Sequence, residues 1–132
     1  MWKEHYKIGV EQIDQQHKQL IMTTEELLQG LKDGSVGRKE SRQIMAFLKD
    51  YIRVHFSTEE MYQEAIGFSL RAEHKKIHEA FSEGLKEFEY KLIRADYDPA
   101  LMQELAAMLT RWWVFHIMRE DKKMLAEIPK KP

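Results

Sequence analysis

Hydrophobic residues recur along most of this chain with the spacing of amphipathic helices. They stand three or four residues apart, so they fall on one face of a helix with about 3.6 residues per turn. No segment shows a convincing strand-type alternation of apolar and polar residues. The third segment shows the helical stripe most cleanly, with Leu70, His74, Ile77, His78, Phe81, Leu85, Phe88 and Leu92.

Short runs rich in glycine, proline and polar residues interrupt the helical pattern around Gly34, Gly67 and Pro99. Asp98 before Pro99 is a strong helix start, because aspartate caps a helix and proline fits the first turn. The breaks leave four helical segments, preceded by a short arm. Their expected bounds are roughly 12–32, 38–65, 69–94 and 98–122.

Helices joined by short loops pack as antiparallel neighbours. We therefore predict an all-α fold, an up-down-up-down antiparallel four-helix bundle. The short N-terminal arm carries Trp2 and Tyr6. At 132 residues, the chain is expected to form a single domain over 1–132.

Composition excludes several classes of protein. The 21 Lys and Arg residues nearly balance the 22 Asp and Glu residues, so the net charge of −1 favours neither a nucleic-acid nor a membrane partner. The absence of cysteine excludes disulfides and iron–sulfur clusters and fits a cytoplasmic location. The first residues lack the apolar core of a secretory signal, and no run is long enough to span a membrane.

Polar residues lie on the apolar stripes, where burial is expected. A buried, unpaired carboxylate is costly unless it takes up a proton or meets a positive charge. His5, in the arm, lies off every stripe and is given no role. The residues on the stripes are His17, His55, Glu59, His74, His78 and His116.

Each of these residues also has a structural interpretation. A core histidine such as His17 is commonly satisfied by ordinary hydrogen bonds. His55 and Glu59, four residues apart, fit a hydrogen-bonded pair on one helix face. His74 and His78 have a spacing found in many metal sites, but it also arises by chance. Taken singly, none of these residues identifies a metal site.

Topology brings these residues together. His17 lies near the start of the first helix and His116 near the end of the fourth, while the two pairs lie at the end of the second and the start of the third. In an up-down-up-down bundle these four places are at the same end. With a rise of about 1.5 Å per residue, the side chains can share one layer of the core. Imidazolium ions would repel one another there, so we expect neutral rings that bind a metal.

A seventh candidate is left open by periodicity. Glu120 stands four residues after His116 and would project on the same helix face. Asp121 stands five residues after His116, about 140° round an ideal helix. It would need a π-bulge or a loosened helix end to join the layer.

Four motifs resemble those of the hemerythrins, and most closely those of the single-domain bacterial proteins of that family. The arm with Trp2 also matches the family's opening, so the resemblance spans nearly the whole chain. The motifs are Ile13-Asp14-Gln15-Gln16-His17, His55-Phe56-Ser57-Thr58-Glu59-Glu60-Met61, His74-x-x-x-His78-x-x-Phe81 and Trp112-Trp113-Val114-Phe115-His116-Ile117-x-x-x-Asp121.

The resemblance implies a centre of two iron ions and a division of the histidines between them. One iron would be held by His74, His78 and His116. The other would be held by His17 and His55, leaving an open position where dioxygen binds. Imidazole is a suitable ligand for iron.

The resemblance also implies two bridging carboxylates, Glu59 and Asp121, together with an oxo or hydroxo group between the irons. It thereby favours Asp121 over Glu120. The expected function is reversible binding of dioxygen by a carrier, store or delivery protein that is not an enzyme. A partner oxidase or electron donor is left unidentified.

Five apolar residues are expected to form a dry wall around the site and to limit proton entry, although plain core packing explains them as well. Members of the family commonly carry an aliphatic residue, often leucine, where this chain has Trp113. A larger ring there could narrow the pocket and slow ligand exchange, or turn outward. The wall residues are Phe56, Phe81, Trp112, Trp113 and Ile117.

Three rival functions use the same residues. A diiron oxidase, peroxidase or iron-handling enzyme usually has Glu-x-x-His pairs and four carboxylates, which this sequence does not show. An oxygen or nitric oxide sensor would need an output domain, which is not expected within these 132 residues. A metal-free interaction bundle would give no reason for histidines to converge.

Overall fold

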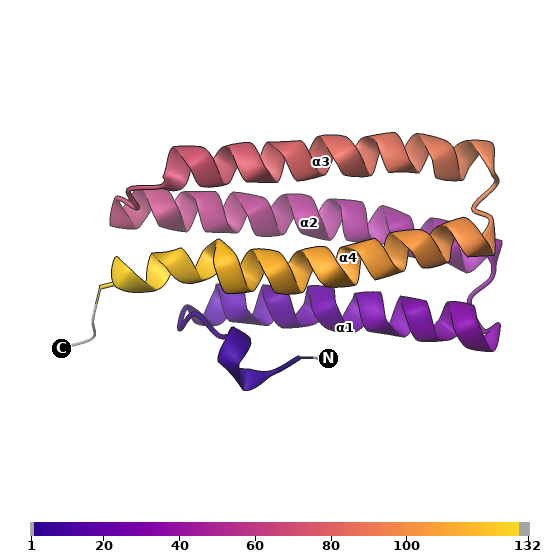
Figure 1. Cartoon of the computed structure of the whole chain (residues 1–132), viewed down its shortest axis with the longest axis horizontal. Helices are drawn as coiled ribbons and strands as arrows, with labels where there is room; N and C mark the ends of the chain where they lie inside the picture. The colour runs from indigo at the N-terminus through magenta and orange to yellow at the C-terminus, as the bar shows by residue number, and fades with distance from the viewer. Residues whose placement is uncertain (1, 130–132) are drawn as a thin grey trace.

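The computed structural model describes residues 2–129, so Met1 and residues 130–132 of the expected domain lie outside the description. Four long helices run side by side along the molecule, and two short 3-10 helices, η1 and η2, flank them (Figure 1). In chain order the elements are η1 (Glu4–Tyr6), α1 (Glu11–Asp33), α2 (Arg38–Ile66), α3 (Arg71–Arg94), α4 (Pro99–Arg119) and η2 (Asp121–Ala126).

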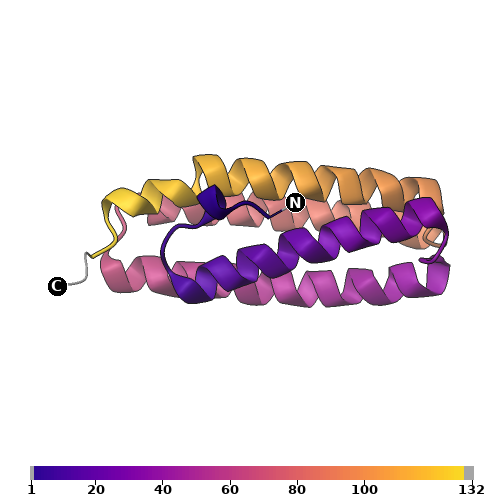
Figure 2. The same ribbon diagram turned by 90° about the horizontal axis from the view of Figure 1, so that it is seen from below.

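Each helix packs against its neighbours in sequence, and α4 closes the bundle against α1. Successive helices run in opposite directions, as Figures 1 and 2 show. The predicted all-α, up-down-up-down bundle is therefore confirmed. Between residues 2 and 129 the regular structure is helical only. None of the helices described there has the length and apolarity needed to cross a bilayer.

The turn between α2 and α3 is longer than the sequence indicated. Gly67 ends α2 in the left-handed conformation, with φ of +66°, which glycine adopts without a steric penalty. The helix α3 then begins at Arg71 rather than at residue 69. As a result Leu70, expected on the buried stripe, precedes the helix and is 39% exposed.

The two ends of α4 differ in how well the sequence predicted them. Asp98 caps its start, as expected, and its Oδ2 accepts a hydrogen bond of 3.1 Å from the Ala100 amide. The end comes earlier than residue 122, because α4 stops at Arg119 and the chain continues as η2. The break at the end of α4 determines which side chain, that of Glu120 or that of Asp121, enters the core.

The hydrophobic core is split into two clusters of unequal size. The larger fills most of the bundle and includes Leu27, Leu48, Leu92 and Leu105. The smaller closes one end, and its buried members are Ile8, Ile13, Phe68 and Met124.

The expected histidine layer lies between the two clusters. On α1, for instance, His17 stands between Ile13 of the smaller cluster and Leu20 of the larger one. The arm closes this end of the bundle, because Asp14 accepts hydrogen bonds from the amides of Ile8 (2.8 Å) and Gly9 (3.1 Å). The layer is therefore covered by apolar side chains on both sides.

Candidate metal centre

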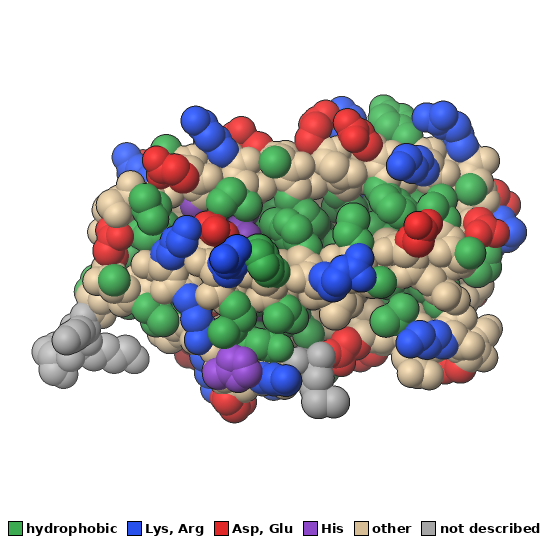
Figure 3. Space-filling view, viewed as in Figure 1, with side chains coloured by type: hydrophobic (Ala, Val, Ile, Leu, Met, Phe, Trp, Pro, Cys, Tyr) green, Lys and Arg blue, Asp and Glu red, His purple; other side chains and the backbone are tan. Residues whose placement is uncertain are grey.

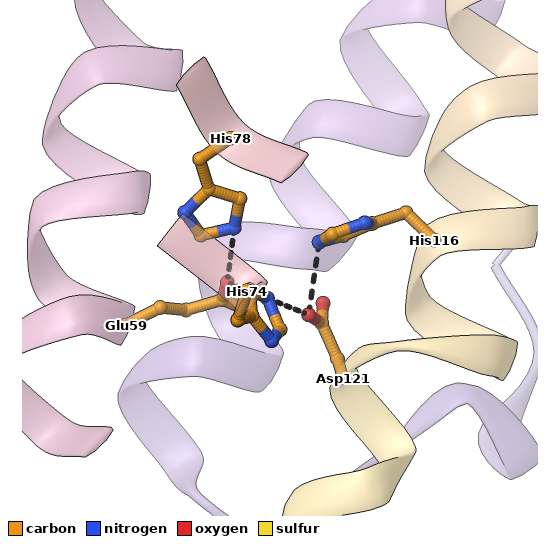
Figure 4. A group of neighbouring side chains, drawn as sticks. All are labelled: Glu59, His74, His78, His116 and Asp121. Carbon is orange, nitrogen blue, oxygen red and sulfur yellow. Dashed lines mark ion pairs between the residues drawn. The ribbon is translucent and has the colours of Figure 1, made fainter. Parts of the chain in front are cut away.

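The structure brings all seven sequence-predicted ligand residues into one buried layer, and five of them are drawn in Figure 4. None of the seven is more than 2% exposed. Every long helix contributes, and η2 supplies the last residue. The layer consists of His17 (α1), His55 and Glu59 (α2), His74 and His78 (α3), His116 (α4) and Asp121 (η2).

Glu59 lies among four of the imidazole rings, and each ring presents its Nε2 atom to the carboxylate. The Nε2 atoms of His17 and His55 lie 3.0 and 3.4 Å from Oε2 of Glu59. Those of His74 and His78 lie 3.5 and 3.1 Å from Oε1. The two carboxylate oxygens thus face different pairs of histidines, as the oxygens of a bridging ligand would.

Asp121 has a similar place on the opposite side of the layer. Its Oδ1 lies 2.9 Å from Nε2 of His74 and 3.0 Å from Nε2 of His116. Its Oδ2 lies 2.9 Å from Nε2 of His17. Asp121 therefore also contacts histidines from both ends of the layer.

The geometry divides the layer into two groups of donor atoms, each small enough to surround one ion. Within a group, one nitrogen or oxygen of every residue lies within 4.8 Å of the others. We call the larger set the five-donor group. Its members are Glu59, His74, His78, His116 and Asp121.

The smaller set, the four-donor group, has one histidine fewer. Because Glu59 and Asp121 belong to both groups, two ions held here would share two carboxylates. The second group also differs in containing no residue of α3 or α4. Its members are His17, His55, Glu59 and Asp121.

Several donor atoms of the layer make no hydrogen bond with good geometry, although they are fully buried. They include Nε2 of His55, His74, His78 and His116 and both oxygens of Asp121. Buried polar groups in proteins are nearly always hydrogen-bonded. A metal ion requires nitrogen and oxygen atoms that converge and are not already engaged in hydrogen bonds. The layer meets this requirement and could hold a metal.

The carboxylates and imidazoles of the layer stabilise each other's charged forms. Burial disfavours the charged forms, yet the surrounding imidazoles hold the pKa values of Glu59 and Asp121 below their ordinary range. Burial also opposes a charge on His17 and His74, but the contacts with Asp121 and Glu59 raise their pKa values to about 10 and about 9.

The expectation that all the rings are neutral therefore needs correction. Burial lowers the pKa of His55, as expected. At neutral pH, however, the two carboxylates favour a proton on both His17 and His74. Repulsion between imidazolium ions favours neutral rings, but the two negative charges between the rings outweigh it at His17 and His74. Protons and metal ions would thus compete for the same nitrogen atoms.

The position at which α4 ends determines that Asp121, rather than Glu120, enters the buried layer. The Glu120 amide donates the last α-helical hydrogen bond, 2.7 Å to the His116 carbonyl. Asp121 then begins η2 and no longer follows the periodicity of α4. It is fully buried, whereas Glu120 pairs with Lys123 near the surface. The loosened helix end considered from the sequence is therefore present.

The aromatic wall lies directly against the rings of the layer. Phe56 stacks on His78, with centroids 3.8 Å apart, and Trp112 stacks on His116 at 4.3 Å. Phe81 in turn stacks on Trp112, with centroids 3.9 Å apart. These contacts fix the planes of two imidazoles. Ile117, the aliphatic member of the wall, is fully buried in the larger core cluster.

Trp113 is directed inward, which excludes an outward rotation. It is fully buried, and its ring meets His55 edge to face with centroids 5.8 Å apart.

The histidines of the five-donor group keep a slight contact with solvent, since His74, His78 and His116 are each 2% exposed. In Figure 3 histidine atoms are visible between α3 and α4.

Sequence reasoning missed two residues that contact the rings from behind. Nδ1 of His55 donates to Oε1 of Gln16 over 2.7 Å, and Nδ1 of His78 donates to Oε2 of Glu60 over 3.0 Å. Both partners stand next to a layer residue in the sequence and so lie off the stripe. Only a search for polar residues beside the ligand positions would have found them.

A four-helix bundle with two imidazole-rich donor groups joined by shared carboxylates defines a non-haem metal-binding bundle. A family model described as the hemerythrin HHE cation binding domain matches residues 8–128. The chain belongs to the hemerythrin family, as its motifs indicated.

Curated relatives agree with this assignment. The chain is 29% identical to a bacteriohemerythrin of Clostridium acetobutylicum over 95% of its own length and 98% of the relative's. It is 30% identical to a bacteriohemerythrin of Pseudomonas aeruginosa, over 92% of this chain and 76% of that one. A myohemerythrin of Theromyzon tessulatum is 29% identical over 92% of this chain and 88% of its own.

Proposed function

We propose that the chain is a non-haem diiron protein that binds dioxygen reversibly, as a carrier, store or delivery protein. One observation carries this proposal: two donor groups of unequal size share Glu59 and Asp121. The unequal groups would hold two ions at unlike sites, and the shared carboxylates would join them. The names of the relatives, bacteriohemerythrin and myohemerythrin, support the same function.

The residues fit a pair of iron ions. Imidazole nitrogens and carboxylate oxygens together are donors that iron accepts. Five imidazoles would be divided as His74, His78 and His116 on one ion and His17 and His55 on the other. An oxo or hydroxo bridge would complete the charge balance. When bound, a pair of ferrous ions supplies the two electrons that dioxygen binding requires.

The chain's own residues then account for reversibility. The four-donor group offers one imidazole fewer, so an ion held there would have one more coordination position open to an exogenous ligand. Beside His55, the buried rings of Phe56 (centroids 5.9 Å apart) and Trp113 (5.8 Å) would keep water and protons away from that ligand. A dry pocket lowers the chance that a bound ligand is protonated and lost irreversibly.

We propose that the protein binds dioxygen and does not catalyse the oxidation of a substrate. Ferritin-like diiron proteins carry four carboxylates around their irons, whereas the layer described here has two. Fewer negative charges stabilise high iron valences less, which favours reversible binding over oxidation of a substrate. The cytoplasmic location and the single-domain organisation stay predictions.

The test is the iron content per chain, combined with an optical spectrum recorded without air, in air, and again under vacuum. We expect two irons and a colourless reduced form that gains visible absorption in air and loses it under vacuum. Two irons with irreversible oxidation would contradict the proposal and favour an oxidase or an iron-handling protein. A folded protein without iron would overturn it entirely.

A further inference from the structure

Two rings of the layer are supported from behind by side chains of different charge. In the five-donor group, Nδ1 of His78 donates to the carboxylate of Glu60 over 3.0 Å. In the four-donor group, Nδ1 of His55 donates to the amide oxygen of Gln16 over 2.7 Å. Both hydrogen bonds are made by Nδ1 of a layer histidine, but one acceptor is anionic and the other is neutral.

The acceptor's charge matters because it acts on the opposite nitrogen of the ring. The Glu60 carboxylate can only accept, so Nδ1 of His78 carries the hydrogen of this bond. Nε2, which faces the layer 3.1 Å from Glu59, would then be the atom that binds a metal. An imidazole whose N–H donates to a carboxylate binds a metal more strongly, through its other nitrogen, than an imidazole whose N–H donates to an amide oxygen. Charge-assisted hydrogen bonds are also roughly twice as strong as neutral ones. His78 is therefore the better electron donor of the two rings.

Gln16 is itself held in place, so its neutral character is built into the fold. Its Nε2 donates to the hydroxyl of Thr58 over 3.2 Å, and that hydroxyl donates to the carbonyl of Val54 over 2.9 Å. These two hydrogen bonds fix the Gln16 amide so that its oxygen, rather than its nitrogen, faces His55. The hydrogen bond then selects the same ring orientation as Glu60 does for His78.

Glu60 stands at the surface, where a charge is inexpensive to hold. It is 32% exposed and lies in a groove of about 880 Å³ between α2 and α3, whose lining also includes His78 and Phe56. The groove thus leads from solvent to the carboxylate behind a ring of the five-donor group. Because Glu60 is partly exposed, it can be changed without leaving a buried charge unpaired.

We propose that Glu60 is a positioning residue which makes the two metal sites electronically unlike. Acting through His78, it strengthens metal binding by the five-donor group and stabilises the higher charge of the ion held there. Gln16 holds His55 in the corresponding orientation without adding charge. This inference rests on the two-metal centre of the proposed function, but not on dioxygen binding.

The first experiment is a titration of the metal-free protein with Co²⁺ alone, in competition with a chelator. Glu60→Gln keeps a hydrogen-bond acceptor for His78 and removes only the charge. We expect the tighter of two Co²⁺ equivalents to weaken by about ten- to hundredfold and the other by less than about twofold. The matched control is Glu83→Gln, which removes the same charge from the same groove without a histidine contact.

The second experiment measures the reduction potentials of the iron-loaded protein. Glu60→Gln should raise the potential of the ion in the five-donor group, because the ferric form loses a negative charge nearby. A tenfold larger loss of ferric than of ferrous affinity corresponds to about 59 mV. Gln16→Glu adds a carboxylate behind His55 and should lower the potential of the other ion.

These outcomes separate this inference from the proposed function. Unchanged Co²⁺ affinities in Glu60→Gln, or equal losses in Glu83→Gln, would overturn the role of Glu60 whatever the protein does with dioxygen. Selective weakening in a protein that fails to bind dioxygen reversibly would support Glu60 and refute the proposed function. Failure of the unsubstituted protein to bind two Co²⁺ ions would overturn both.

Discussion

The two halves of this bundle are built from the same four helices but bury opposite kinds of side chains. The half that contains the α1–α2 and α3–α4 turns (Figure 1) is filled by residues such as Leu27, Leu48, Leu92 and Leu105, which are at most 1% exposed. The other half buries five imidazoles and two carboxylates, none more than 2% exposed, next to the smaller apolar cluster. Helical periodicity alone does not distinguish the halves, since both follow the same stripes.

The difference shows that one fold can be stabilised by two unlike mechanisms. Burial of apolar surface contributes about 25 cal/mol per Å² and needs no bound ion. A buried cluster of charges is stable only when positive and negative charges balance, and removing one partner is costly. We therefore expect the apolar half to respond to packing changes, and the polar half to respond to protons and metal ions.

The largest expected effect follows from removing a carboxylate that both donor groups share. Asp121→Ala should prevent stoichiometric binding of two metal ions, because each group loses a donor. It should also destabilise the metal-free protein by about 3–5 kcal/mol, since buried imidazoles lose their counter-charge. Metal content by elemental analysis and urea unfolding measure the two effects.

Two control variants test whether this effect belongs to the polar half. Glu120→Ala removes the neighbouring carboxylate, which pairs with Lys123, and should leave the metal content unchanged. Leu105→Ala, in the apolar half, should cost about 2–5 kcal/mol of stability and still leave two metal ions bound. Loss of metal in Glu120→Ala would show that Asp121 was wrongly chosen.

The sequence predicted most of the polar half because its residues obey helical periodicity. His17, His55, Glu59, His74 and His116 are all on stripes, and a short-loop bundle brings those stripes to one end. Periodicity could not reach a residue beyond the end of α4. That position depends on where the last helical hydrogen bond forms, and only the family resemblance supplied it.

Periodicity also could not identify partners that act from the side of a stripe. Gln16 and Glu60 each adjoin a layer residue and would be read as surface positions. Nor could it foresee the raised pKa values of His17 and His74, which depend on contacts between different helices. What the sequence leaves undetermined here is the distance between side chains of separate elements.

The pH dependence of stability should differ with and without metal. The pKa values of His17 and His74 rise from 6.5 to about 10 and about 9 in the metal-free fold. The folded chain therefore binds more protons than the unfolded chain between these values, and stability falls as pH rises. The contribution of His17 and His74 to stability is complete below pH 6.5, decreases as the pH rises through about 9, and is lost above about pH 10.

Urea unfolding with a chelator and with bound metal would measure this decrease. A metal ion takes the place of the protons, so the loaded protein should show a flatter dependence and should release protons on loading. The carboxylates act in the opposite direction, since their lowered pKa values remove stability only when the solution becomes acidic. Equal slopes for the loaded and metal-free proteins would contradict competition between protons and metal.

The smallest expected effect concerns the boundary between the two halves, where Trp113 of the larger apolar cluster touches His55 of the four-donor group. If its ring narrows the ligand pocket, Trp113→Leu should speed dioxygen release by about tenfold, or about 1.4 kcal/mol. Stopped flow measures the rate. Trp112→Leu is the matched control, because Trp112 stacks on His116 of the five-donor group and should affect release less. An unchanged rate in Trp113→Leu would make Trp113 a packing residue of the apolar half, and the boundary would then lie at His55 itself.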